Sequence, residues 1–466
     1  MTAPPTASPP TTDTIDSQRD KLRAHFAAGA TRNIGDRLDA LKRLRSAIRA
    51  HEQELCDALH ADLHKAPQES YMTEIAIVLN EINLHIRKLR RWARPRRVGT
   101  PLFMFGSSSR IVPQPLGVAL VIAPWNYPFQ LLVNPLVGAI SAGNCAMLKP
   151  SPYVPAVNSV IRQIVAEAFD PAHVAMAEGG REVNTALLAR QWDYIFFTGS
   201  PALGHVVMQA AARFLTPLTL ELGGKSPCIV DRGADLDIAA RRIAWGKLIN
   251  AGQTCVAPDY LLVQSELRQP LISRIAHYIQ RSYGRDARQS PDYPRMVNTE
   301  ALERVAGLIA RQGTVAYGGE VDPADRYIEP TIIEGVRPDD PIMQQEIFGP
   351  VLPVITYDTL DEALALINAG EKPLALYYFG PRLSARQAIA RTASGGACIN
   401  DVVMHLANDR LPFGGVGHSG MGKYHGRYSF ETFSNLRAVV RASTRIDFPV
   451  RYAPYGKLSI LKKLIK

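Results

Sequence analysis

Several features that mark other classes of protein are missing from this 466-residue chain. Its five cysteines form no Cys-x-x-Cys pair, so neither a metal site nor a disulfide framework is indicated. No apolar run has the length of about 20 residues that a membrane-spanning helix needs. The Pro- and Thr-rich N-terminus lacks the basic and apolar regions of a signal peptide, so none is predicted. These absences favour a protein without a metal in a reducing, cytoplasmic compartment.

Composition and charge narrow the class further. With 46% hydrophobic and 21% charged residues the chain is an ordinary soluble globular protein, and its length predicts two or three domains. The net charge of +10 is concentrated in residues 87–97 and 441–466. A basic cluster can bind nucleic acid or an anionic membrane. We see no aromatic-interleaved basic motif and no recognition helix in either cluster, so nucleic acid is not expected as a partner.

One cysteine stands in a position suited to chemistry. Cys255 lies in Asn250-Ala-Gly-Gln-Thr-Cys-Val-Ala-Pro258, directly after a predicted helix. A thiol is mostly protonated at pH 7, so a cysteine that attacks a carbonyl needs a base within reach. The candidate base is Glu221, in an apolar strand that ends at Gly223-Gly224, because burial raises the pKa of a carboxylate toward the useful range. Alone, such a cysteine is more often a core residue; the two motifs together favour a nucleophile with its base.

The same two motifs carry a family resemblance. Leu220-Glu-Leu-Gly-Gly-Lys-Ser-Pro227 followed by Gly252-Gln-Thr-Cys255 resembles the paired active-site signatures of the aldehyde dehydrogenase superfamily. The run from Asp235 to Tyr260 looks like the class 3 branch, which acts on fatty and aromatic aldehydes. The resemblance covers about residues 30–445. It implies NAD(P)-dependent oxidation of a medium- or long-chain aliphatic or aromatic aldehyde to the carboxylic acid.

The resemblance also implies a mechanism. The Cys255 thiolate would form a thiohemiacetal whose oxyanion is held by the Asn126 amide and the Cys255 N–H, and loss of hydride would give a thioester. Glu221 would then activate water. The histidines His405 and His418 are alternative bases, although a loop histidine is more often a hydrogen-bonding surface group. Apolar or aromatic residues in the segments that bear motifs form the predicted substrate wall: Tyr127, Trp245, Met404 and Phe413.

The cofactor site is predicted from a missing glycine motif and from the segment that stands in its place. The chain has no Gly-x-Gly-x-x-Gly fingerprint; in its place, residues 196–204 form a strand, a Gly-Ser turn and a helix start, where backbone N–H groups can hold a pyrophosphate. By resemblance, Lys149 binds the adenosine ribose, Glu346 binds the nicotinamide ribose and Phe348 packs against the cofactor. The resemblance places the diphosphate at Gly199, Ser200 and Gly204.

The choice between cofactors depends on one further position. Many aldehyde dehydrogenases carry Lys-Pro-x-Glu at the adenosine ribose, where the carboxylate repels a 2′-phosphate. This chain has Lys149-Pro-Ser-Pro152, so that carboxylate is replaced by Pro152. We therefore expect both NAD and NADP to serve as cofactor.

Short buried strands alternate with helical stretches, which indicates an α/β fold with ligands at the carboxyl ends of the strands. Two long helices are expected between Asp36 and Ala93. The strands are predicted at 117–124, 145–149, 194–197, 218–222 and 226–230. With the resemblance, the expected fold is aldehyde dehydrogenase-like: two open twisted α/β domains and a small β oligomerisation region. The predicted division is a disordered leader (1–15), an NAD(P)-binding domain (16–95 and 117–224), a catalytic domain (225–410), an oligomerisation region (96–116 and 424–450) and a basic amphipathic tail (451–466).

The oligomerisation region predicts a homodimer, and the tail predicts a weak peripheral membrane contact, with packing on the protein itself as the more common alternative. Two other functions stay open. One is an esterase or thioesterase that uses Cys255 and Glu221 without redox chemistry. The other is a non-catalytic binding scaffold, which is disfavoured because no matched catalytic position has been lost.

Overall fold

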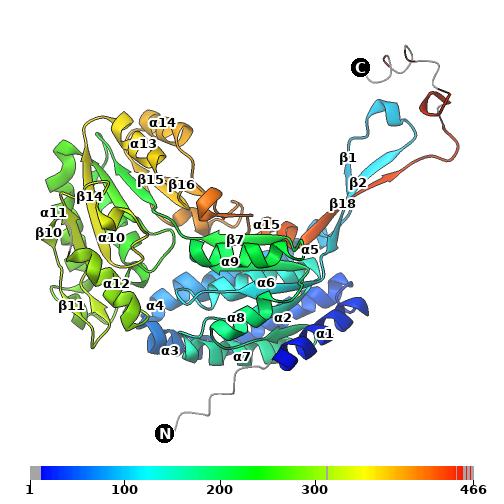
Figure 1. The fold of residues 1–466 in the computed structure, drawn as a ribbon, viewed down its shortest axis with the longest axis horizontal. Helices are drawn as coiled ribbons and strands as arrows, with labels where there is room; N and C mark the ends of the chain where they lie inside the picture. The colour runs from blue at the N-terminus through cyan, green and yellow to red at the C-terminus, as the bar shows by residue number, and fades with distance from the viewer. Residues whose placement is uncertain (1–11, 311–312, 448, 455–457, 459–461, 463–466) are drawn as a thin grey trace, which may run out of the picture.

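The computed structural model describes residues 12–310, 313–447, 449–454, 458 and 462. In this part of the chain, two large sheets lie side by side, each with helices on both faces, and a narrow arm projects from one of them (Figure 1). None of the described helices is both long and apolar enough to cross a membrane.

The first large sheet is parallel except for one short edge strand. Its strands, in spatial order, are β17 (Gly420–Met421), β7 (Leu218–Leu222), β6 (Tyr194–Gly199), β3 (Val118–Ile122), β4 (Cys145–Lys149) and β5 (Val174–Met176). In β3, Val118, Leu120 and Ile122 face one core cluster, whereas Ala119 and Val121 face the other. Both faces are therefore covered, which is why these strands are continuous apolar runs.

Helices provide the cover on each side. The face that receives Val118 is packed by α1 (Thr12–Ala27), α8 (Arg181–Leu188) and α9 (Pro201–Ala212). The opposite face is packed by α2 (Ile34–Ala50), α3 (Glu52–Leu63), α5 (Ala76–Trp92), α6 (Gln130–Ala142) and α7 (Pro155–Ala168).

The second large sheet has seven strands, parallel except for β10 at one edge. Their order is β10 (Thr314–Tyr317), β13 (Thr331–Glu334), β14 (Val351–Tyr357), β9 (Tyr260–Gln264), β8 (Pro227–Val230), β15 (Ala375–Phe379) and β16 (Gly396–Ile399). One face is packed by α10 (Leu236–Leu248) and α11 (Arg268–Tyr283). The other is packed by α12 (Thr299–Ile309), α13 (Leu360–Ala369) and α14 (Arg382–Arg391). The α/β prediction is confirmed.

The chain passes between the two sheets at the predicted active-site motif. It leaves the first sheet at the end of β7 and enters the second at β8, and only residues 223–226 separate the two strands. After β16 the chain returns to the first sheet, where β17 pairs antiparallel with β7. Glu221 therefore lies at the end of a strand beside the crossing.

The arm contains three antiparallel strands. These are β1 (Arg96–Val98), β2 (Ser108–Pro115) and β18 (Ser434–Arg441), and the short helix α15 (Arg427–Thr432) leads into the last of them. Figure 1 shows the arm standing away from both sheets. Because β2 lies in the middle, β1 and β18 each leave one edge unpaired within the arm.

Two predictions are corrected. Between Asp36 and Ala93 the chain forms more than two helices, because α2 ends at Ala50 beside the non-helical His51, and His64 with a left-handed φ of 58° ends α3. The short helix α4 (Pro67–Ser70) and a π-helical turn (Tyr71–Ile75) follow before α5 begins.

The leader also ends earlier than residue 15. Helix α1 begins at Thr12, and Ile15 is fully buried against the first sheet. Residues 1–11 lie outside the described residues, as does most of the predicted tail after residue 454.

Candidate active site

Cys255 follows a turn with an unusual backbone. Asn250 and Ala251 have φ values of 52° and 51°, in the left-handed region that non-glycine residues enter at a cost of about 1 kcal/mol or more. Gly252 also has a positive φ, and a Cβ there would collide with the main-chain oxygen of Gly349. A turn of this kind persists only when its surroundings hold it, so the loop carrying Cys255 is shaped by tertiary contacts.

The Cys255 side chain is partly exposed, and carboxylates face it. Burial among protein atoms raises the pKa of this thiol, and the charges of Glu346 and Glu221 raise it further. The backbone N–H groups of Cys255 and Val256 act in the opposite direction, because they stabilise the thiolate. The resting thiol is therefore protonated at neutral pH and needs a base before it can attack a carbonyl.

Glu221 has the surroundings of such a base. The residue is 2% exposed, and neither carboxylate oxygen has a hydrogen-bond partner within the described part of the chain. Burial raises its pKa well above the ordinary value, and the nearby Lys423 cation opposes that shift. The Lys423 ammonium donates instead to the main-chain oxygens of Gly414 and Gly415. A buried, unpaired carboxylate is costly to maintain and is suited to taking up a proton.

Asn126 lies against the loop that carries Cys255. Its amide Nδ2 donates to the main-chain oxygen of Gln253 at 3.0 Å, and its Oδ1 has no partner among the described residues. The next residue, Tyr127, places its hydroxyl 2.5 Å from Oγ1 of Thr254. The structure thus places the Asn126 amide against the Cys255 loop, at a residue two positions before Cys255.

The βα turn predicted for the diphosphate has the expected shape. Gly199 ends β6, and Ser200 caps the N-terminus of α9, where its hydroxyl accepts from the Leu203 N–H at 3.4 Å. Gly204 is buried in the first turns of that helix. Lys149 ends β4 on the same edge; it is 1% exposed and donates to the Pro150 oxygen at 2.7 Å, and burial lowers its pKa to about 8. A helix N-terminus and a buried cation fit an anionic dinucleotide.

Glu346 and Phe348 lie beside the Gly-Gly crossing. A Cβ at Gly223 would collide with the Glu346 carboxylate, so glycine allows this close approach. The Gly224 N–H bonds the carboxylate, while burial raises the pKa of Glu346 to about 8. Phe348 packs edge-on against Trp125, with ring centroids 5.4 Å apart. Since Glu346 also raises the pKa of Cys255, the predicted nicotinamide side is close to the nucleophile.

The residues of the predicted substrate wall differ in how far their side chains are exposed to solvent. Tyr127 is 7% exposed and Trp245 is partly buried, whereas Met404 is 47% exposed. Phe413 is buried between two histidine rings, His405 and His425, with centroid distances of 5.9 and 5.2 Å. Met404 is thus open to contact, and Phe413 is built into the core.

Neither alternative histidine base has support from its contacts. His405 has its Nδ1 3.4 Å from Sγ of Cys398, and burial lowers its pKa to about 4. His418 packs near the His205 ring, with centroids 6.2 Å apart. In the described residues, neither makes a hydrogen bond to Cys255 or Glu221. Glu221 remains the candidate base.

The sequence prediction missed a polar network behind Asn126. Its members are Lys65, Glu69, Glu74, Asn250, Gln253 and Thr254. The last three belong to the cysteine motif and could have been suspected from it. Lys65 and Glu74 give no such signal, because lysine and glutamate side chains are mostly exposed and their burial cannot be read from the sequence.

Fold and site together define a class of protein. The parallel sheet offers a dinucleotide-type turn at its carboxyl edge, the loop that carries Cys255 contacts the Asn126 amide, and the buried Glu221 carboxylate acts on the thiol through its charge. This combination suits a nicotinamide-dependent oxidoreductase that forms a covalent bond to a carbonyl carbon.

The chain belongs to the aldehyde dehydrogenase family, whose model matches residues 6–439. It is 46% identical over 447 residues to 4,4′-diaponeurosporen-aldehyde dehydrogenase of Staphylococcus aureus (strain NCTC 8325 / PS 47), covering 95% of this chain and 97% of the relative. It is 45% identical to aldehyde dehydrogenase family 3 member B1 of Rattus norvegicus, covering 97% of each. The canine enzyme named aldehyde dehydrogenase, dimeric NADP-preferring, is 46% identical over 90% of this chain and 92% of its own length.

Solved structures agree. The substrate-bound state of Staphylococcus aureus AldH superposes with a TM-score of 0.95 at 44% identity, covering 97% of this chain and 99% of that one. The chain is thus a member of the class 3 branch, and it is an NAD(P)-dependent enzyme that oxidises aldehydes. That membership disfavours both a scaffold and an esterase without redox chemistry.

Proposed function

We propose that Cys255, Asn126 and Glu221 carry out the oxidation, with medium- or long-chain aliphatic or aromatic aldehydes as substrates. The observation that carries this proposal is the buried Glu221 carboxylate, which has no partner in the described part of the chain and whose charge reaches Cys255. A nearby cation, Lys423, keeps its ammonium on main-chain oxygens and leaves the carboxylate free for protons.

In the first half-reaction Glu221 accepts the thiol proton, directly or through a water, and the Cys255 sulfur attacks the aldehyde carbon. Asn126 Nδ2 then exchanges its bond to the Gln253 oxygen for one to the developing oxyanion, which the Cys255 N–H also binds. A nicotinamide held beside Glu346 and Phe348 would supply the acceptor for the hydride of this carbon.

In the second half-reaction the carbon is bound to Cys255 as a thioester. Glu221 first releases the thiol proton to solvent; it then takes a proton from water, and the hydroxide adds to the thioester carbon. The carbon–sulfur bond then breaks, which releases the acid and restores the cysteine. The same carboxylate therefore serves both halves, as a buried base with a raised pKa can.

The chain length and shape of the aldehyde are tested by a steady-state screen. Straight-chain aldehydes of increasing length are compared with benzaldehyde-type substrates by kcat/KM. We expect kcat/KM to rise with chain length, because each buried CH₂ contributes about 0.8 kcal/mol. A maximum at the two-carbon aldehyde would contradict the proposed substrate class.

For the cofactor we expect NAD⁺ and NADP⁺ to have kcat/KM values within about tenfold of each other. Pro152 is exposed and follows the strand that ends in Lys149, so no carboxylate stands at that position to repel a 2′-phosphate. The variant Pro152→Glu should shift the ratio toward NAD⁺, as measured by kcat/KM for both cofactors on one aldehyde.

Pro152→Gln is the matched control. It also removes the proline, and its side chain has the size of glutamate but carries no charge. It should leave the cofactor ratio nearly unchanged. If Pro152→Glu and Pro152→Gln behave alike, position 152 does not face the ribose.

The arm also supports a homodimer. Leu436, Val439 and Val440 are exposed on β18, whose outer edge is unpaired within the arm, and such an edge is usually covered. Sedimentation at micromolar concentration should give a dimer. Val440→Lys should weaken it, because a charge on an edge strand opposes pairing; a monomeric parent protein would refute the assignment.

A cytoplasmic location with weak membrane contact is the final part of the proposal. All five cysteines are free, as expected in a reducing compartment. In the tail, Leu458 is exposed, and the sequence around it alternates apolar and basic residues. Binding to anionic vesicles should fall when residues 455–466 are removed; equal binding of both proteins would exclude this contact.

A further inference from the structure

We propose that Lys65 and Glu74 are positioning residues that hold Asn126 where the oxyanion develops. The inference rests on the proposed role of Asn126. Neither residue belongs to a motif of the predicted active site, and both come from the segment between α3 and α5.

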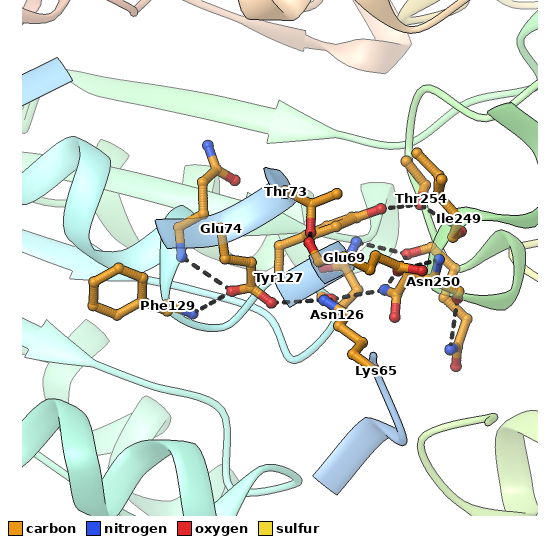
Figure 2. A network of polar contacts seen from close by, with 12 residues as sticks. Lys65, Glu69, Thr73, Glu74, Asn126, Tyr127, Phe129, Ile249, Asn250 and Thr254 are labelled. Carbon is orange, nitrogen blue, oxygen red and sulfur yellow. Dashed lines mark hydrogen bonds and ion pairs between the residues drawn. The ribbon is translucent and has the colours of Figure 1, made fainter. Parts of the chain in front are cut away.

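Asn126 lies in a segment with little regular structure of its own. The chain leaves β3 at Ile122 and enters α6 at Gln130, and no helix or strand covers the residues between them. Buried backbone groups in such a segment must find other partners. Figure 2 shows that side chains from the segment between α3 and α5 bind backbone groups of this segment.

Lys65 supplies the first anchor. Its ammonium donates to the main-chain oxygen of Asn126 at 2.9 Å and to Oε1 of Glu74 at 2.6 Å (Figure 2). It also lies 4.2 Å from the centre of the Tyr127 ring. The Lys65 side chain is 0% exposed, so the cation is fully satisfied by groups on or beside the Asn126 segment.

Glu74 supplies the second anchor. Its Oε2 accepts from the N–H of Phe129 at 2.9 Å and from the N–H of Gln130 at 3.3 Å. These donors lie at the N-terminus of α6, where N–H groups have no partner within the helix. The pair therefore holds the segment at Asn126 itself and at the C-terminal end of the segment, where α6 begins.

The energetics favour a positional role. A fully buried ion pair typically stabilises a fold no more than well-packed apolar residues would, because both charges lose their water. Its particular contribution is a set of directional bonds. Glu74, the acidic member of the pair, lies in a π-helical turn, Tyr71–Ile75. Such turns are frequent at functional sites.

The same segment also reaches the loop of the nucleophile. Oε1 of Glu69 accepts from the Asn250 N–H at 2.8 Å, and Nδ2 of Asn250 donates to the Asn126 oxygen at 2.7 Å. Asn126 is thus held from two sides by contacts that converge on one carbonyl. A misplacement of about 1 Å can cost about a hundredfold in rate, so these bonds bear on the reaction itself.

A double-mutant cycle tests the proposal. Lys65→Met and Asn126→Ala are made singly and together, and the single-turnover rate of reduced cofactor formation is measured with the dissociation constant of NAD⁺. Lys65→Met should slow the first turnover by about tenfold to a hundredfold and change the dissociation constant less than about twofold. In the Asn126→Ala background, Lys65→Met should cost less than about a further twofold, because it acts through Asn126.

Two further variants distinguish a loss of positioning from a simple folding defect. Lys65→Met/Glu74→Leu removes both charges and leaves none unpaired, and it should show the same slow first turnover with a normal melting temperature. Arg190→Met breaks the part-buried pair with Asp16, 2.6 Å apart, between α1 and the end of α8. It should lower the melting temperature and leave the first turnover unchanged.

The outcomes separate two failures. If the losses from Lys65→Met and Asn126→Ala multiply, or if Lys65→Met has a normal first turnover, the positioning role is wrong. If Asn126→Ala itself has a normal first turnover, the proposed oxyanion role of Asn126 fails.

Discussion

Cys255→Ala is expected to reduce aldehyde oxidation to less than about a hundredth of the parent rate. The methyl group of alanine cannot form the thiohemiacetal, and no other residue in the described site offers a nucleophile at that place. The variant should keep its affinity for NAD⁺, because the residues predicted to bind the cofactor are unchanged. The measurement is the steady-state rate on one good aldehyde, with NAD⁺ binding followed separately.

Cys398→Ala is the matched control for this experiment. Cys398 is also partly exposed, but burial raises its pKa to about 11 and its sulfur contacts His405. Its replacement should leave oxidation nearly unchanged. A Cys255→Ala protein that retains more than about a hundredth of the parent activity would show that Cys255 is not the nucleophile.

Glu221→Gln is expected to lower kcat by about a hundredfold to ten-thousandfold, the usual contribution of a general base. The amide keeps the shape of the side chain but cannot accept a proton from water. If hydrolysis of the thioester becomes limiting, the acyl group accumulates on Cys255. Mass spectrometry of the quenched enzyme would detect it as an adduct that the parent protein lacks.

The pH dependence of kcat provides a second test of the role of Glu221. Because burial raises its pKa, the carboxyl group is protonated below that pKa and acts as a base only above it. The kcat of the parent should therefore rise as the pH passes through this raised pKa and level off above it. Glu221→Gln should lose this rise.

A matched control is Glu329→Gln. Burial also raises the pKa of Glu329, but this carboxylate bonds the Glu320 N–H far along the chain from the site. It should keep both the kcat and the pH profile of the parent. A Glu221→Gln protein with a normal kcat and no adduct would assign the base to another group.

Strands were predictable where local signals agreed. β4 and β7 have the bounds expected from the sequence, because each is a short apolar run between residues that end strands. The helices between Asp36 and Ala93 were not predicted correctly. The chain breaks at His51 and at the left-handed His64, and a π-helical turn leads into α5; none of the three has a strong local signal.

By itself the sequence determined the family and singled out Cys255 and Glu221 as the candidate nucleophile and base, since these depend on residue types at short spacings. Only the tertiary structure decided that Lys65 and Glu74 reach the Asn126 segment. Those contacts join residues 55 to 61 positions apart, and nothing local distinguishes a buried Lys–Glu pair from a solvated one. The physical reason is that the partners of a buried charge are chosen by the packing of distant segments, which no short motif records.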